Sequence, residues 1–92
     1  HKVIDLTAEG PHVERELALL KVSGTGEKRA ESLRIADIFR ARAVDSTNSS
    51  FVFEITGTTD KLNAFIDLMG PLGLTEVART GVVGMARGSE VP

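Results

Sequence analysis

The sequence predicts an α+β domain of strand–helix–strand–strand–helix–strand order, in which two helices cover one face of a four-stranded antiparallel sheet. Three observations predict this fold. First, 92 residues suffice for a single modest hydrophobic core. Second, an apolar strand, a glycine-containing turn and an acidic first helical turn occur twice with a period of 33 residues, at 20–28 and at 53–61. Third, apolar residues alternate in the expected strands and recur every three to four residues in the expected second helix.

The first copy of the repeat begins with a strand at about 14–23, which is rich in leucine and valine. Its helix is expected at about 26–41, because Glu27 suits the positive end of the helix dipole and arginines follow near the other end. A short strand at about 43–46 completes this copy. Residues 1–12, which precede the first strand, are interpreted as the last strand of a preceding domain plus a linker. The alternative is a disordered N-terminal tail, because a lone strand without its sheet has nothing to pair with.

The second copy begins after a turn at 47–49, whose polar residues predict a hairpin into a strand at 50–56. Thr58 or Thr59 can cap the second helix. Its apolar residues recur at helical spacing: Leu62, Phe65, Ile66 and Met69.

Gly70 and Pro71 end this helix, because proline cannot continue the hydrogen-bond ladder. A last strand is expected at about 74–83, followed by a frayed end. The predicted organisation is therefore one domain at 13–88, with the remnant and linker at 1–12 before it and a tail at 89–92. The element order is that of the ferredoxin-like, or ACT-like, two-layer sandwich.

Both sides of the predicted first strand are apolar, although helices cover only one face of the sheet. Side chains alternate along a strand, so every second residue of a strand faces the helices. In the third strand these residues are Phe51, Phe53 and Ile55, and in the first strand they are Ala18, Leu20 and Val22. The residues between them face the opposite way. An apolar face without a cover indicates a partner. The candidate interface residues are therefore Leu17, Leu19, Val52 and Glu54.

The composition excludes several classes of function. A net charge of −2 offers no basic surface for nucleic acid, and the absence of Trp and Tyr leaves few platforms for stacking bases. The sequence has no apolar run of about 20 residues, so no membrane partner is expected. It contains no cysteine, which fits a reducing cytoplasm.

No pattern of residues builds an active site, and we expect no catalytic, metal-ligating or cofactor-binding residue. Asp45 and Glu54 lie in strands that pair, but exposed sheet charges explain them better than acid–base catalysis. Glu14 and Glu16 flank an arginine, which favours surface ion pairs. His1 and His12 lie in the polar N-terminal region, where a solvated or interface histidine is more common than a metal ligand.

A weaker candidate is a site for an anion or a small effector. Gly24 and Gly26 lie in the turn before the first helix, and Gly57 occupies the equivalent turn in the second copy. Arg79 could bind a carboxylate with two nitrogens. Ordinary turn chemistry and a solvated arginine are the alternatives. If these residues do bind an effector, the domain is an ACT-like sensor that binds an amino acid at a dimer interface, rather than purely an association module.

Four spaced motifs resemble one known family in the same order: 13–22 (VERELALLKV), 36–41 (ADIFRA), 57–62 (GTTDKL) and 76–83 (EVARTGVV). They are similar to the C-terminal domain of the acetolactate (acetohydroxyacid) synthase small regulatory subunit, over about 13–88. Residues 2–6 resemble the end of that family's N-terminal ACT domain. The resemblance implies a non-catalytic regulatory domain of the bacterial cytoplasm.

The resemblance also implies partners and cofactors. The partner is the large catalytic subunit, which condenses 2-oxo acids in branched-chain amino acid biosynthesis. Thiamine diphosphate, magnesium and FAD are expected on that subunit and none on this chain. The domain is expected to self-associate as a homodimer or larger assembly, and to transmit valine feedback inhibition. Because the valine site of the family lies mainly in the ACT domains, no valine-binding residue is assigned here.

Overall fold

The computed structural model describes residues 12–89. The elements in chain order are β1 (His12–Ser23), α1 (Gly26–Ile38), β2 (Arg42–Ser46), β3 (Ser50–Gly57), α2 (Thr59–Met69), the 3-10 helix η1 (Gly70–Leu72), β4 (Leu74–Arg79) and β5 (Val83–Ala86). The predicted strand at the start of the chain and most of the predicted tail lie outside the described residues.

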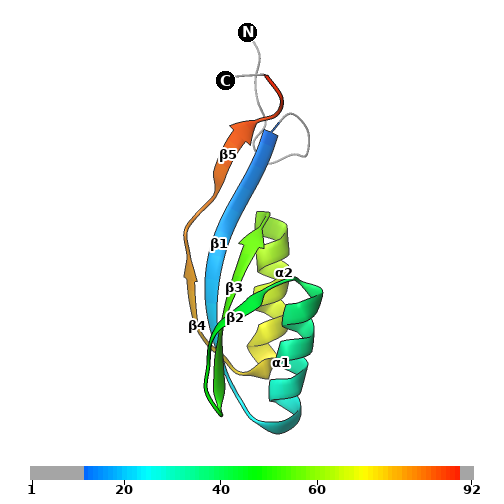
Figure 1. Ribbon diagram of the computed structural model, residues 1–92, viewed down its shortest axis with the longest axis vertical. Helices are drawn as coiled ribbons and strands as arrows, with labels where there is room; N and C mark the ends of the chain where they lie inside the picture. Colours follow the sequence, from blue (N-terminus) through cyan, green and yellow to red (C-terminus); the bar gives the residue numbers. More distant parts are fainter. Residues whose placement is uncertain (1–11, 90–92) are drawn as a thin grey trace.

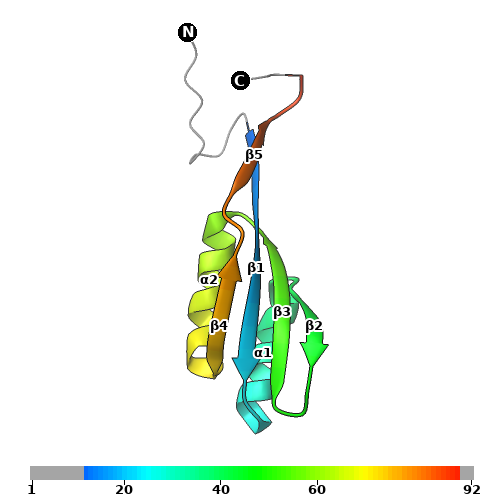
Figure 2. The ribbon, with the colours of Figure 1, turned by 90° about the vertical axis from the view of Figure 1, so that its left-hand side faces the viewer.

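The strands form one antiparallel sheet in the order β2-β3-β1-β4, and β5 pairs with β1 beyond the end of β4. Figure 2 shows this sheet from the side that the helices do not cover. The first strand of each repeat copy, β1 or β3, lies in the centre, and the last, β2 or β4, lies at an edge. The ferredoxin-like fold and the repeat order predicted from the sequence are confirmed.

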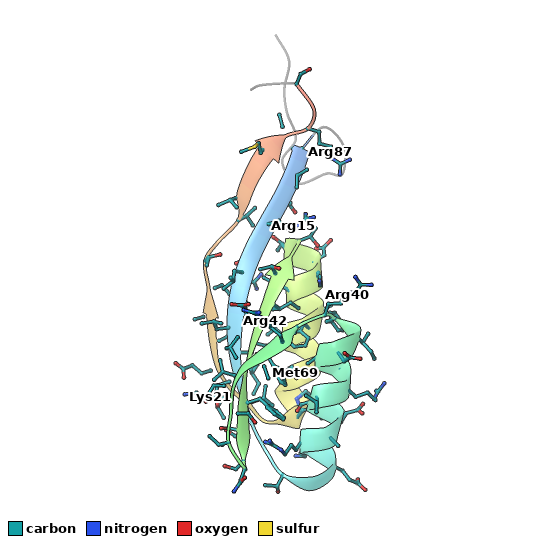
Figure 3. All side chains as sticks on the ribbon, in the orientation of Figure 1. Arg15, Lys21, Arg40, Arg42, Met69 and Arg87 are labelled. Atoms are coloured by element: carbon teal, nitrogen blue, oxygen red, sulfur yellow. The ribbon has the colours of Figure 1, made fainter. Side chains whose placement is uncertain are left out.

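Both helices pack on one face of the sheet, and the core lies between the two layers (Figure 1). The predicted inward-facing residues of β1 and β3 are all buried: Ala18, Leu20, Val22, Phe51, Phe53 and Ile55. From α2, Leu62, Phe65 and Met69 complete the core, and Figure 3 shows Met69 between helix and sheet. The rings of Phe53 and Phe65 meet edge to face at 6.2 Å between centroids, a favourable geometry.

The first helix is shorter than the predicted 26–41, because α1 ends at Ile38 in a Schellman motif. Arg40 adopts the left-handed conformation with φ of 57°. Its N–H donates to the carbonyl oxygen of Asp37 at 3.1 Å, and that of Ala41 donates to Ala36 at 2.8 Å. Glycine usually occupies this position, so an arginine there gives no sequence signal for the end of the helix.

The single last strand predicted at 74–83 is wrong, since the structure divides it into β4 and β5. Gly81, with φ of 85°, turns the chain between the two strands. The first strand is correspondingly longer than predicted, because β1 begins at His12 to pair with β5. Within residues 12–89 the sheet therefore has five strands rather than the predicted four.

The N-terminal end of β1 and all of β5 form a two-stranded arm that extends beyond the helices (Figure 1). We define the arm as residues 12–15 and 83–86. The arm makes the molecule elongated, with extents of 56 × 19 × 19 Å. Near its tip, Nε of Arg87 donates to the carbonyl oxygen of His12 at 3.2 Å, so Arg87 is tied to the arm rather than frayed.

Among the described residues, neither helix has the length and apolarity needed to cross a membrane. Within the same residues, no three His, Asp or Glu side chains come close enough to hold a metal ion.

Candidate interaction surface

The side of the sheet away from the helices, here called the open face, carries the predicted interface residues. The register places Leu19 of β1 between Glu54 of β3 and Ala78 of β4, so all three side chains lie on this face. The residues that β1, β3 and β4 contribute to this face include Leu17, Leu19, Lys21, Val52, Glu54, Thr56, Glu76 and Ala78. The alternation read from the sequence thus gives the correct face for each candidate.

The middle of the open face is apolar and solvent-accessible. Leu19 is 38% exposed, whereas its neighbour Leu20 on the helix side is completely buried. Leu17 and Val52 are half-buried. Leu19 and Val52 help to line a hollow of about 200 Å³, whose other walls are Lys21, Glu76 and Ala78. A partner side chain could fill this hollow and remove apolar surface from water.

Charged residues flank this apolar centre, and they pair within the chain. Nζ of Lys21 lies 3.3 Å from Oε1 of Glu76, and Figure 3 shows Lys21 pointing away from the helices. Nε of Arg42 donates to Oε1 of Glu54 at 2.8 Å. Glu54, a predicted interface residue, is therefore neutralised by Arg42. The register places Asp45 opposite Val52 rather than opposite Glu54, so these two carboxylates are not cross-strand partners.

A buried carboxylate lies where the arm meets the rest of the sheet. Glu16 is only 6% exposed and accepts two hydrogen bonds from Arg79, at 3.0 Å from Nε and 2.8 Å from Nη2. The N–H of Gly81 donates to the same carboxylate at 3.2 Å. Nη1 of Arg79 donates to Oδ1 of Asn63 at 2.7 Å, which ties the pair to α2. We call Glu16, Arg79, Gly81 and Asn63 the joint.

The electrostatics of the joint favour the ionised carboxylate. The hydrogen bonds from Arg79 hold the pKa of Glu16 below its usual value, burial opposes this effect, and the Gly81 N–H adds to it. The same pairing raises the pKa of Arg79. Charge-assisted, two-pronged hydrogen bonds of this kind are directional, so the joint holds its elements in one geometry.

The expectation that Glu16 forms only surface ion pairs is wrong, because its carboxylate is buried where β1 meets Arg79 and Gly81. Arg79 does bind a carboxylate with two nitrogens, and in this structure the carboxylate belongs to Glu16 of the same chain. Sequence reasoning missed the pairing because the two residues are separated by 63 positions. One signal in the sequence could have indicated the pairing. Glu16 is a charged residue at a position of β1 that faces the helices, and a charged residue there needs a partner.

The structure separates the four candidate effector residues into two groups. Gly24 follows the end of β1 at Ser23, whereas Gly57 pairs with Glu16 near the joint. Seven residues of strand, or about 23 Å, separate these two ends of the sheet. Gly57 and Arg79 thus lie at one end and Gly24 and Gly26 at the other, so one small ligand cannot contact all four.

The chain itself already occupies the surroundings of two of these glycines, Gly24 and Gly57. The N–H of Gly24 donates to the carbonyl oxygen of Ser49 at 2.8 Å. Gly57 is covered by the side chain of Lys61, which a Cβ at Gly57 would approach to 2.5 Å. Gly26 has φ of 60°, a conformation that glycine adopts without strain. The geometry of the three glycines is thus explained by turns and packing.

His12 is neither a solvated residue nor part of a metal cluster in the described chain. It is 5% exposed, and its Nε2 lies 3.8 Å from a carboxylate oxygen of Glu14. His12 is the first residue of β1, within the stretch that was predicted to contain a linker.

Fold and surface together define a ferredoxin-like α+β domain whose sheet has one uncovered, partly apolar face. The sequence model of the family described as "Small subunit of acetolactate synthase" matches residues 15–88. The chain belongs to this family.

Individual relatives agree with this assignment. The chain is 49% identical over 89 residues to a probable acetolactate synthase small subunit of Archaeoglobus fulgidus, a match that covers 97% of this chain and 55% of the relative. It is 52% identical over 87 residues to the acetolactate synthase small subunit of Aquifex aeolicus, covering 94% of this chain and 45% of the relative. The chain thus spans about half the length of these relatives.

A solved structure supports the same fold. The crystal structure of the acetolactate synthase small subunit from Thermotoga maritima matches with a TM-score of 0.80 at 39% sequence identity. The match covers 87% of this chain and 49% of the other.

Proposed function

We propose that this chain is a non-catalytic regulatory module of an acetolactate synthase, which self-associates through the open face and transmits valine feedback inhibition to a catalytic subunit. The observation that carries the proposal is the exposed apolar centre of the open face around Leu19, on a domain of the small-subunit family. Apolar surface of this kind is stabilised when a partner covers it.

The proposed partner is the large catalytic subunit of the same enzyme, as the name of the family suggests. Thiamine diphosphate, magnesium and FAD would belong to that subunit, and the condensation of 2-oxo acids would take place there. The role of this chain is mechanical. Two copies of this chain, held in a fixed arrangement by their open faces, would link the catalytic subunits. An effector bound elsewhere in the complex would then change the activity of these subunits together.

Self-association is tested by substituting the centre of the open face. We expect sedimentation of the wild-type chain at tens of micromolar to show a dimer or larger species, and Leu19→Asp to shift it to monomer. A charge at this position would lose its water on association without gaining a partner. Leu33→Asp is the matched control, because Leu33 is 50% exposed on α1 rather than on the sheet. A monomeric wild type at these concentrations would contradict self-association.

Binding to the catalytic subunit is tested separately by calorimetry. We expect the chain to bind purified catalytic subunit, whereas titration of the chain alone with valine should give no heat of binding. The physical reason is that two of the four effector candidates already have partners within the chain, since Arg79 binds Glu16 and Gly24 donates to Ser49. Saturable heat with valine alone, lost in Arg79→Leu, would instead favour a small-molecule sensor.

A further inference from the structure

The arm exposes large apolar side chains that neither α1 nor α2 covers. Val83 and Met85 of β5 are 72% and 77% exposed, and Val13 of β1 is 40% exposed. Val13 pairs directly with Met85, and Arg15 with Val83. These residues contribute to an apolar groove of about 490 Å³. A two-stranded ribbon without a core is marginal in water, so this surface needs a cover to be stable.

The exposed side of the arm continues the open face. Alternation along β1 places Val13 and Arg15 on the same side as Leu17 and Leu19. Val83 and Met85 share that side, because directly paired residues of antiparallel strands project to the same face. The surface is therefore continuous along the whole of β1. It is flanked by β5 and β4 along one edge of β1 and by β3 and β2 along the other (Figure 2), and we call this whole surface the strip.

The joint keeps the arm in line with the open face. The N–H of Leu17 donates to Oγ1 of Thr80 at 3.1 Å, and the N–H of Thr80 donates to the carbonyl oxygen of Leu17 at 3.0 Å. Gly81, the turn between β4 and β5, is held by the carboxylate of Glu16. The arm is thus anchored at its base, and a partner that binds the strip pays little ordering entropy there.

The size of the strip indicates that the arm and the body of the sheet act together. The four-stranded body measures about 19 Å by about 26 Å, or roughly 500 Å² in plane, from ordinary strand spacings. A standard interface needs about 800 Å² of accessible surface per partner. The arm adds about 130 Å² in plane, or about a quarter, which brings the strip closer to that size.

The charges of the strip indicate which partner covers it. By register it carries three cationic residues, Arg15, Lys21 and Arg42, and three anionic residues, Asp45, Glu54 and Glu76. A balanced surface attracts neither a strongly acidic nor a strongly basic partner. It suits an identical surface, which offers the same length, the same apolar centre and the same balance.

We propose that the arm, through Val13, Val83 and Met85, forms part of the interface between two copies of this chain. The inference deepens the self-association proposed above and rests on it. The second copy covers the arm and the open face as one continuous surface.

The test compares substitutions in the arm and in the body by sedimentation. We expect the double variant Val83→Asp/Met85→Asp to weaken self-association at least tenfold, as Leu19→Asp does. Leu68→Asp, at an exposed site of α2, is the control and should have no effect. If the wild type dimerises and Leu19→Asp abolishes it, but the arm variant dimerises normally, the role of the arm is refuted while the proposed function stands. A monomeric wild type instead refutes the proposed function.

A second measurement does not depend on how well the arm variant folds. The sequence has no cysteine, so Met85→Cys carries a single spin label. We expect the label to become immobilised as the protein concentration rises through the dimerisation range, and to stay mobile when Leu19→Asp is added. If the label at position 85 instead dissociates the dimer, this also supports a contact of the arm with the second copy, because the label then disturbs the interface. A label that stays mobile in an intact dimer, or that only the catalytic subunit immobilises, overturns the assignment.

Discussion

Glu16 is the residue that most clearly links local chemistry to the shape of this molecule. Its carboxylate is buried, receives both prongs of Arg79 and accepts the N–H of Gly81 at the turn before β5. A buried carboxylate persists only when it is paired and hydrogen-bonded. The geometry of the joint satisfies that requirement and fixes the base of the arm.

The charge of Glu16 predicts a dependence of stability on pH. Because the folded-state pKa is lowered from 4.5, the stabilisation is fully present above the unfolded value and is lost as pH falls through the folded value. We expect Glu16→Gln to unfold at a lower temperature than wild type at pH 7. The difference should shrink below about pH 4. Thermal unfolding followed by circular dichroism at several pH values measures it.

Glu31→Gln is the control for this experiment, since Glu31 pairs with Arg34 on the surface of α1 and both side chains are exposed. Exposed pairs contribute little, so its effect at pH 7 should be small. If the difference in unfolding temperature between wild type and Glu16→Gln stayed constant down to pH 3, the shape of the side chain rather than its charge would matter at this site.

At the scale of elements, the end of α1 shows how one backbone conformation stops a helix. The Schellman hydrogen bonds from Arg40 and Ala41 close the helix at Ile38, two residues after Ala36, the last buried residue of α1. In α2 the same task falls to Pro71, and Thr58 caps the start by accepting from the N–H of Lys61. A proline after a helix and a threonine before it can be recognised in a sequence, whereas a left-handed arginine cannot.

The left-handed conformation of Arg40 predicts a stabilising substitution. Arg40→Gly should raise the free energy of unfolding by about 1 kcal/mol, because glycine adopts this conformation without a clash at Cβ. Ala30→Gly, at an exposed position inside the same helix, should lower it by about 1 kcal/mol. Urea unfolding of the three proteins gives both differences. A destabilising Arg40→Gly would show that the arginine side chain contributes more than the strain costs.

The two strands after α2 also belong to this scale. β4 and β5 follow the same edge of β1 but are separated by the turn at Gly81. This break lets β4 cover the body of the sheet and β5 extend the arm. The element boundary therefore creates the exposed surface of Val83 and Met85, on which the proposed role of the arm rests.

At the scale of the whole molecule, one layer of helices and one sheet leave a single core and a single uncovered face. The core is centred on Phe53, which is completely buried and whose ring contacts the rings of Phe51 and Phe65. The opposite face has no second layer within the described residues. Association is the arrangement in which such a sheet buries both faces.

The single core predicts a large and global effect of cavity formation. Phe53→Ala should lower the free energy of unfolding by about 3–5 kcal/mol, which combines lost burial with an unfilled cavity. Phe39→Ala is the matched comparison, because Phe39 is only partly buried beside Phe65 and should cost less. Urea unfolding with circular dichroism measures both. Equal losses at the two sites would contradict a core centred on Phe53.

Much of this protein follows from its sequence by itself. The 33-residue repeat, the alternation in β1 and β3 and the helical spacing in α2 determine the order of elements, the core residues and the face to which Leu17, Leu19 and Val52 belong. These features are local, because they depend on the periods of strands and helices and on turn residues close together in the chain.

Only the tertiary structure decides the rest. The pairing of Glu16 with Arg79, the separation of Gly24 from Gly57 and the division of the last strand depend on contacts between residues far apart in the chain. The arm is the clearest case, since β5 is a strand only because the extended end of β1 offers it an edge. Periodicity within one segment carries no information about which other segment satisfies its hydrogen bonds, so these features become visible only when the chain is folded.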